Sequence, residues 1–228
     1  MLAPIQALYA TPAMRGLLRA ETAVLTAFLG TRPATHGLYL AMHSDPRSMP
    51  DPVARWAHLY AAGDEWHGPL RARVDTALPF ADDSFAVVVI SHVHQHVDDC
   101  GQLIREAERV IEPEGLVILV GLHPMSPWMP WVCWQMRGMQ RAMHMIWPFR
   151  IGQDMLYNSL DMEASRRFGA VVPRDVDLSA GNGYSLGGGY MLVARKRRRA
   201  PTKLKFRSNS KQLRMSGALA PGTHRECA

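Results

Sequence analysis

The chain has 228 residues, of which 47% are hydrophobic and 20% charged, and this is long enough for one folded domain with a sizeable core. Three cysteines exclude a disulfide scaffold, and the apolar content excludes a collagen-like or wholly disordered chain. The formal net charge is +6, but residues 195–228 hold eleven Lys/Arg and one acidic residue. The positive charge therefore belongs to the C-terminal segment, and the rest of the chain is mildly acidic.

The cysteines are odd in number, and none of Cys100, Cys133 and Cys227 forms a C-x-x-C pair. This pattern favours a reducing, cytoplasmic location. The N-terminus shows no signal-peptide pattern, and no unbroken apolar run reaches the roughly 18 residues of a membrane span. We therefore expect a cytoplasmic protein with no integral membrane segment.

Hydrophobic periodicity predicts strands that alternate with helices. Residues 1–30 have helical spacing and end at Gly30. The clearest buried strand runs from Phe85 to Ile90, and a helix of about three turns follows and ends at Pro113. Further strands are predicted at 35–43, 55–63, within 70–80, and at 115–123, 171–178 and 188–196, with a short helix at 160–168. The last two strands flank the turn GNGYSLGGG and predict an antiparallel hairpin at a sheet edge.

This alternation indicates an open α/β sheet, in which ligands bind beyond the carboxyl ends of the strands. We expect an N-terminal helical segment over residues 1–34 and an α/β domain over residues 35–196. Residues 197–228 are basic and punctuated by Ser and Pro, which predicts a disordered tail.

One stretch of about 50 residues carries an ordered series of motifs. They are Leu78-Pro79-Phe80, Asp83-Ser84-Phe85, the histidine-containing turn His92 to His96, Arg105-Glu106-Ala107-Glu108-Arg109-Val110, and Glu112-Pro113-Glu114-Gly115. The series resembles the class I S-adenosylmethionine-dependent methyltransferases of the type 11 group. Gly121, Pro124 and Ser126, together with the basic tail, look like a bacterial subgroup of that family. The resemblance implies a Rossmann-like, seven-stranded, mostly parallel sheet with helices on both faces and a C-terminal antiparallel hairpin.

The resemblance also implies S-adenosylmethionine as the cofactor and methyl transfer to a small-molecule or macromolecular acceptor, which it does not identify. The first strand departs from the family pattern. It should run into a G-x-G-x-G turn, but here it reads HGLYLAMHSDP, and His43, Ser44 and Asp45 occupy the turn. The acidic residue that ends the family's second strand has a counterpart in Asp64 or Glu65 only if the register is shifted.

The site residues carried over from the resemblance follow the predicted strands. Expected cofactor contacts are His43, Ser44, Asp75, Thr76, Ala77, Leu78, Ser91 and His92. A weak nucleophile would need a base, and His92, His94 and His96 are the candidates. The loop after the strand at 115–123 is expected to face the substrate through His123, Met125, Ser126 and Trp128.

Several features leave alternatives open. The three clustered histidines lack a Cys or carboxylate pair at ligand spacing, so no metal site is expected. The Trp- and Met-rich residues 128–149 fit a core-covering helix, a lid over an apolar substrate, or an interfacial helix on a membrane. Residues 195–214 fit nonspecific contact with RNA or anionic lipid, or a solubilising tail. The alternative to an enzyme is a catalytically inactive methyltransferase-fold protein that acts as a binding or scaffold partner.

Overall fold

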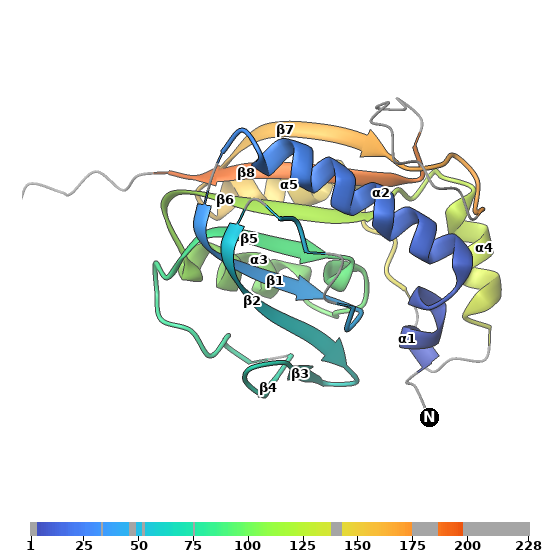
Figure 1. Ribbon diagram of the computed structural model, residues 1–228, viewed down its shortest axis with the longest axis horizontal. Coiled ribbons are helices and arrows are strands. Elements are labelled where there is room, and N and C mark those ends of the chain that lie inside the picture. Colours follow the sequence, from blue (N-terminus) through green and yellow to red (C-terminus); the bar gives the residue numbers. More distant parts are fainter. Residues whose placement is uncertain are drawn as a thin grey trace, which may run out of the picture.

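One sheet runs through the molecule, with its strands in the order β4-β3-β2-β1-β5-β6-β8-β7 (Figure 1). The computed structural model describes residues 4–32, 34–45, 49–51, 53–74, 76–137, 143–174 and 187–197, and eight strands form within them. The strands are β1 (Ala34–Ala41), β2 (Val53–Ala62), β3 (Glu65–His67), β4 (Ala72–Arg73), β5 (Phe85–Ser91), β6 (Ile111–Leu122), β7 (Leu160–Phe168) and β8 (Gly189–Lys196).

The central strands β2, β1, β5 and β6 are parallel. Strand β8 is antiparallel to both β6 and β7, and the short strands β3 and β4 add an antiparallel edge beside β2. The expected α/β sheet with a parallel core and C-terminal antiparallel strands is therefore confirmed. The expected seven strands become eight in the described part of the chain, because two short strands lie between β2 and β5.

Helices cover both faces of this sheet. Helix α1 (Pro4–Tyr9) leads into α2 (Pro12–Leu29), which crosses the front face in Figure 1. Helices α3 (Cys100–Val110) and α5 (Pro148–Tyr157) lie on the opposite face, while α4 (Trp128–Gln135) lies at the edge where the parallel strands end. A single 3₁₀ turn, η2 (Val93–Gln95), follows β5.

Local sequence explains where the helices begin. The side chain of Thr11 accepts a hydrogen bond from the Met14 amide at the start of α2, where Pro12 supplies a preset φ. Asp99 does the same for α3, because its Oδ1 accepts a 2.8 Å bond from the Gln102 amide. These N-caps satisfy amides that the helix itself leaves unpaired.

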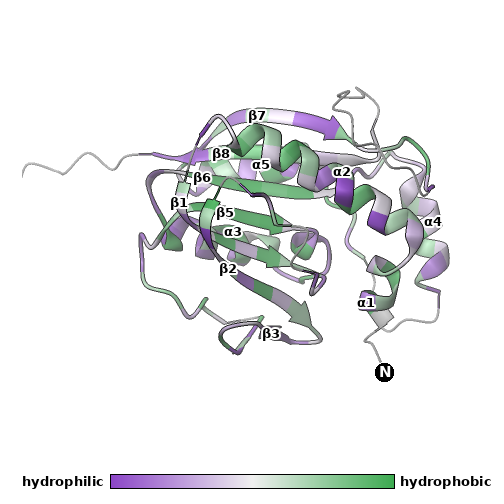
Figure 2. Cartoon of the chain, viewed as in Figure 1, coloured by the Kyte–Doolittle hydropathy of each residue, from purple (hydrophilic) through white to green (hydrophobic). Residues whose placement is uncertain are grey.

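The core lies along the middle strands, which Figure 2 shows as the most hydrophobic part of the sheet. In β5, every side chain from Val87 to Ser91 is at most 1% exposed. Burial on both faces explains the unbroken apolar run, since each such side chain contributes about 1.5–3 kcal/mol to stability.

The connection from β1 to β2 is short for a parallel pair. Such crossovers usually contain a helix, but no helix forms among the described residues of the 42–52 connection. The Trp56 indole covers part of this face and donates a 2.9 Å hydrogen bond to the Pro50 carbonyl. Gly37 has a packing role, because a Cβ there would come within 2.4 Å of the Trp56 ring.

Three predicted elements were wrong. Residues 160–168 form strand β7, not a helix. Its charged, weakly patterned sequence LDMEASRRF suits a sheet edge that resists pairing with other chains. The partner of β8 in the final hairpin is therefore β7, since residues 171–174 form no strand and 175–178 lie outside the described residues. The strand expected within 70–80 shortens to β4, and the sequence did not predict β3.

The Gly-rich run before β8 has a steric explanation. A Cβ on Gly187 would lie 2.2 Å from the Phe168 carbonyl oxygen, and a Cβ on Gly188 would lie 2.2 Å from the Trp128 indole. Close packing of the hairpin therefore requires these glycines. The predicted disordered tail cannot be compared, because residues 198–228 lie outside the described part.

Candidate functional site

A cavity of about 460 Å³ lies beyond the carboxyl ends of β2 and β5, next to the start of α3. Its volume is within the range of small-molecule and cofactor pockets. The lining residues are Asp64, Trp66, Arg73, Val74, Thr76, Leu78, His96, Val97, Asp98, Asp99, Gln102, Leu103 and Glu106. They come from segments far apart in the sequence that the sheet topology brings to one edge.

Carboxylates predominate among the charged groups of this cavity. Asp64, Asp98, Asp99 and Glu106 contribute four acidic side chains, against one basic side chain from Arg73. Carboxylates accept hydrogen bonds from hydroxyl and amino groups and repel phosphates. The cavity therefore suits a neutral or cationic ligand rich in hydroxyl and amino groups better than a phosphorylated one.

The motifs that carry the family resemblance hold one wall of the cavity in place. The Arg109 guanidinium donates to the carbonyl oxygens of Phe80 at 2.8 Å and Leu78 at 2.9 Å. Glu106 accepts a 2.8 Å bond from the Leu78 amide and also pairs with Arg109. The paired charges hold the pKa of the Glu106 carboxyl below its usual value. The conserved-looking spacing of the LPF and R-E-A-E-R motifs thus corresponds to a clamp on the loop that contains Leu78.

Beside the cavity, polar side chains are buried where β1 and β5 end. Both ring nitrogens of His43, the hydroxyl of Ser91 and Nδ1 of His96 are buried and have no hydrogen-bond partner within the described residues. Tyr9 of α1 packs over them, with ring centroids 6.1 Å from His43 and 6.0 Å from His96. Buried polar atoms without partners are rare and mark places where a ligand or water completes the bonding.

A buried carboxylate attaches helix α2 to this edge. Glu21 is 1% exposed, and its carboxylate lies 3.2 Å from His92 Nε2 and 3.4 Å from the Tyr39 hydroxyl. His92 Nδ1 faces Gln95 Oε1 at 3.3 Å, and the Gln95 amide is oriented by its bonds to both backbone groups of Leu122. Both nitrogens of His92 thus face oxygen atoms, so the His92–Glu21 pair holds one proton more than a neutral imidazole and a carboxylate would share.

The other two histidines of the turn are neutral at ordinary pH. Burial lowers the pKa of His96 to about 3, and it lowers the pKa of His94 well below its usual value. His94 Nε2 lies 2.8 Å from the Tyr190 hydroxyl, and His96 Nε2 lies 3.0 Å from the Tyr9 hydroxyl. Of the three candidate bases, His96 alone lines the cavity.

The predicted cofactor contacts are thus divided between two places. Thr76 and Leu78 line the cavity, whereas His43, Ser91 and His92 lie in the buried layer beside it. Ser44 and Ala77 are exposed and do not line the cavity, and Asp75 lies outside the described residues.

Two groups of residues were missed from the sequence. Asp64 follows β2 by two residues, so the acidic position at the end of the second strand could have been found from the strand's end. Tyr9 and Glu21 gave no signal, because their role depends on where α1 and α2 pack against the sheet.

The predicted substrate-side loop contains both structural and exposed side chains. Ser126 donates a 2.7 Å bond to the His123 carbonyl, and the buried Trp128 indole donates a 2.8 Å bond to the Ala170 carbonyl. Met125 is 70% exposed, and the His123 ring is half-buried between neighbouring aromatic rings. Only Met125 and His123 are thus placed to meet a ligand at this edge.

Comparison with known proteins agrees with this arrangement. Residues 53–119, from β2 into β6, match the family model described as a methyltransferase domain. This stretch is a class I methyltransferase domain of the type 11 group. No curated protein matches the sequence significantly. Within the described residues, no helix is long and apolar enough to cross a bilayer, and no three side chains of the His, Cys, Asp or Glu type are grouped to bind a metal ion.

Two solved structures show the same fold at low sequence identity. The chain is similar to an S-adenosylmethionine-dependent methyltransferase from Thermotoga maritima, with 14% identity and a TM-score of 0.54 over 85% of this chain and 99% of that one. It is also similar to the Burkholderia thailandensis 1,6-didemethyltoxoflavin-N1-methyltransferase, which was solved with S-adenosylhomocysteine and its substrate. That match has 12% identity and a TM-score of 0.54 over 80% of each chain.

The methyltransferase domain indicates S-adenosylmethionine as the cofactor. The residues present fit such a group on two observations. The cavity offers acidic and hydroxyl side chains suited to ribose hydroxyls and amines, and the unpartnered polar atoms of His43 and Ser91 lie next to it. Side chains thus take the place of the missing glycine turn.

Proposed function

We propose that this chain transfers a methyl group from S-adenosylmethionine to an acceptor that enters from the carboxyl edge of the sheet. The observation that carries the proposal is the cavity itself. It lies where class I domains bind ligands, it is bounded by the matched methyltransferase segment, and its lining suits a cationic, hydroxyl-rich group. Within the α/β domain proposed for residues 35–196, the helices of residues 1–34 cover this edge.

In the proposed site, Thr76, Leu78 and Asp64 hold the adenosyl part of the cofactor, and His43 and Ser91 take its remaining polar groups. When bound, the cofactor supplies an activated methyl group on a sulfonium centre. The protein's task is then alignment of acceptor and methyl group, because the electrophile needs no further activation.

We assign His96 the role of orienting the acceptor. Its unpartnered Nδ1 is buried at the cavity, and a neutral imidazole nitrogen accepts a hydrogen bond from an N–H or O–H group. The pKa of about 3 makes it a weak base in this state, so it positions an acceptor better than it deprotonates one. His92 and His94, each bonded through other side chains, stabilise the turn that presents His96.

The test is transfer of a tritiated methyl group from labelled S-adenosylmethionine into fractionated small molecules and macromolecules from cell extract. We expect label transfer by the wild-type chain and a loss of roughly ten-fold or more with His96→Gln, while cofactor affinity stays within about two-fold. Wild-type protein that binds the cofactor but labels nothing would contradict the catalytic proposal.

One observation favours the inactive scaffold as the second candidate. Tyr9 and the histidine layer fill the space above the end of β1, where the family's glycine turn would admit the cofactor closely. A His43→Leu variant separates the two candidates. A scaffold would lose nothing, because His43 has no bonding partner in the described structure. A cofactor site would lose affinity, by roughly ten-fold for one hydrogen bond.

We further propose a cytoplasmic location, based on cysteine usage, and a bacterial origin, based on the resemblance. The basic residues 195–214 are proposed to contact RNA or anionic lipid without sequence specificity, because Lys and Arg neutralise phosphates. Electrophoretic mobility shift with single-stranded RNA at increasing salt tests the RNA contact, which should weaken steeply as salt rises. Binding that ignores salt would contradict it.

A further inference from the structure

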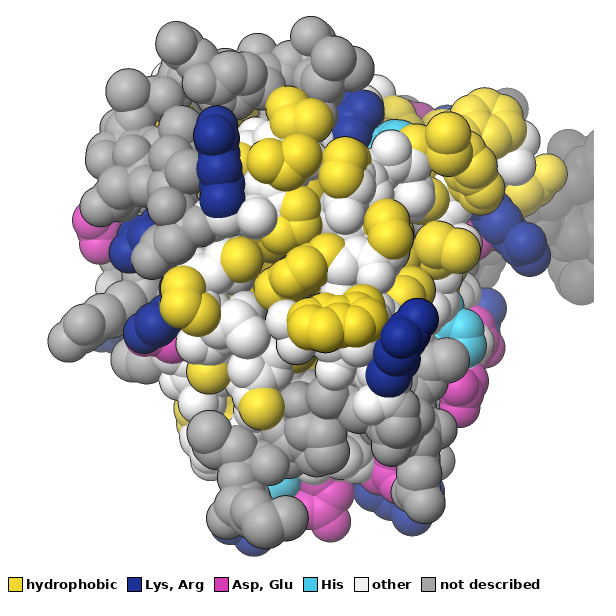
Figure 3. Space-filling model, turned by 90° about the vertical axis from the view of Figure 1, so that its right-hand side faces the viewer, with side chains coloured by type: hydrophobic (Ala, Val, Ile, Leu, Met, Phe, Trp, Pro, Cys, Tyr) yellow, Lys and Arg dark blue, Asp and Glu magenta, His cyan; other side chains and the backbone are white. Residues whose placement is uncertain are grey.

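Large apolar side chains are exposed together at the carboxyl edge of the sheet. Five of them define what we call the apolar face: Met125, Trp134, Met145, Trp147 and Phe149, which are 53–74% exposed. They come from the loop after β6, from α4, and from the segment that enters α5. Figure 3 shows hydrophobic side chains gathered over this side of the molecule. An exposed cluster of this kind marks an interaction surface.

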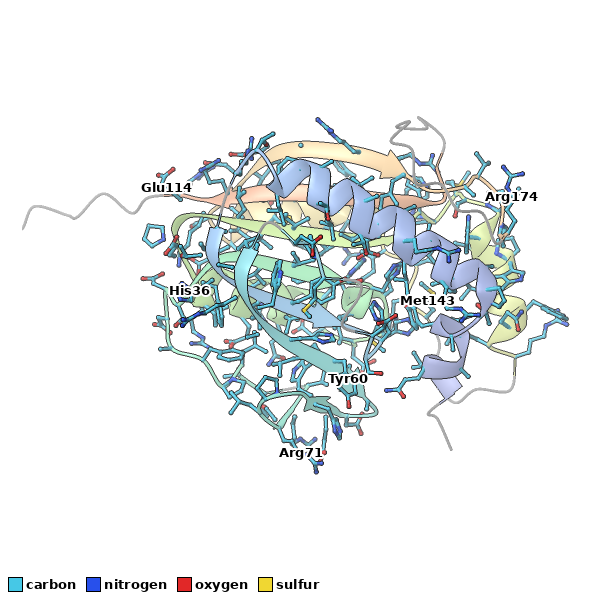
Figure 4. The ribbon with its side chains drawn as sticks, in the orientation of Figure 1. His36, Tyr60, Arg71, Glu114, Met143 and Arg174 are labelled. Atoms are coloured by element: carbon cyan, nitrogen blue, oxygen red, sulfur yellow. The ribbon has the colours of Figure 1, made fainter. Side chains whose placement is uncertain are left out.

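The charges around the apolar face have one sign. Residues 115–153 contain no Asp or Glu, and Arg137 and Arg150 within them are exposed. Arg174, also exposed, lies at the same edge as Met143, whereas Glu114 and His36 lie at the opposite edge (Figure 4). In Figure 3, Lys and Arg side chains surround the hydrophobic side chains, and acidic ones lie only at the margins.

Two further details concern the kind of partner. Helix α4 reads WMPWVCWQ and has no charged residue, so it does not have the charged outer face of an ordinary surface helix. The exposed tips are tryptophan, phenylalanine and methionine. Tryptophan prefers the boundary between lipid headgroups and acyl chains, and arginine beside it reaches lipid phosphates.

We propose that the apolar face docks on the surface of an anionic lipid bilayer, with these side chains inserted among the headgroups and Arg137, Arg150 and Arg174 against lipid phosphates. Shallow insertion needs apolar area together with positive charge and no acidic residue between them, and this face provides all three. The proposal concerns a surface and does not depend on methyl transfer. It also does not depend on the basic tail, because β8 ends at Lys196 on the opposite edge of the sheet.

The test is cosedimentation of the full chain with phosphatidylcholine vesicles, with and without about one third phosphatidylglycerol. We expect binding to the anionic vesicles and a shift of tryptophan emission to shorter wavelength, because Trp134 and Trp147 leave water. The variant Trp134→Gln/Trp147→Gln/Phe149→Gln should lose roughly ten-fold or more of the partition coefficient. The matched control is Leu156→Gln/Tyr157→Gln, which changes exposed residues at the far end of α5 and should bind as wild type does.

Each other outcome overturns the proposal. Vesicle binding that persists in the triple variant would assign the membrane contact to the basic tail. Absence of binding by the wild-type chain, or a dimer that the triple variant abolishes, would make the face a protein interface. Quenching of wild-type tryptophan emission by brominated lipid provides a second test that needs no variant, and unquenched emission would contradict insertion.

Discussion

The buried carboxylate of Glu21 allows a direct test of how the N-terminal helices are held on the sheet. The Glu21→Ala variant leaves His92 Nε2 and the Tyr39 hydroxyl without their acceptor in a fully buried place. Removing one partner of a buried charged pair costs about 3–5 kcal/mol. This is a large part of the roughly 5–15 kcal/mol that stabilises a typical domain.

Urea unfolding with linear extrapolation measures this loss, provided that the slope of the transition is the same in both proteins. We expect a fall in the melting temperature of about 10 °C for a chain of this size. The control is Asp161→Ala, which removes a carboxylate that is 50% exposed and pairs with Arg197, and it should leave the midpoint nearly unchanged. A loss below about 1 kcal/mol in Glu21→Ala would refute the assignment of the pair as the attachment of α2.

Three further predictions follow from the site. Burial lowers the pKa of His43 to about 4 and of His96 to about 3, so the unfolded chain takes up protons first as the pH falls below about 6.5. Stability should be constant above neutrality and fall between pH 6 and 4 by up to about 1.4 kcal/mol per pH unit for each group, and His43→Leu should flatten this slope. Arg109→Met removes the clamp on the cavity wall and should cost about 2–4 kcal/mol and weaken cofactor binding, as measured by urea unfolding and calorimetry. In a Cys227→Ser background, a thiol reagent should label the exposed Cys133 in the native protein. It should label buried Cys100, whose pKa burial raises to about 12, only after unfolding.

Each of these predictions has an outcome that would count against it. An unfolding free energy that is flat from pH 7 to 4 would show that the histidines are not buried as neutral groups. An Arg109→Met protein with unchanged affinity for the cofactor would separate the clamp from the cavity. Equal labelling rates for the two cysteines in native protein would show that α3 does not protect Cys100.

The central part of the fold could be predicted from local patterns. The run from Phe85 to Ile90, the helix that begins at Cys100 and the next strand form a continuous unit whose periodicities are strong and local. The LPF and R-E-A-E-R motifs were also visible, although the sequence alone could not show that Arg109 binds the carbonyl oxygens of Leu78 and Phe80.

The remaining features depend on contacts between distant segments. Tyr9 and His96 are 87 residues apart, and Glu21 and His92 are 71 apart, so no local pattern reports their pairing. Strand β7 was misassigned because an edge strand with one solvated face carries charges that resemble those of a short helix. The candidate cofactor residues were placed by resemblance at two neighbouring strand ends, and only packing shows that some line a cavity while others are buried.

The most direct test of the account is calorimetric titration of S-adenosylmethionine and S-adenosylhomocysteine into the full chain, in parallel with Asp64→Asn and His43→Leu. We expect wild-type dissociation constants in the micromolar range, about 8 kcal/mol of binding free energy, and weaker binding by both variants. Absence of heat, together with no thermal shift at millimolar ligand, would contradict the cofactor site and leave a methyltransferase fold that does not bind its family's cofactor.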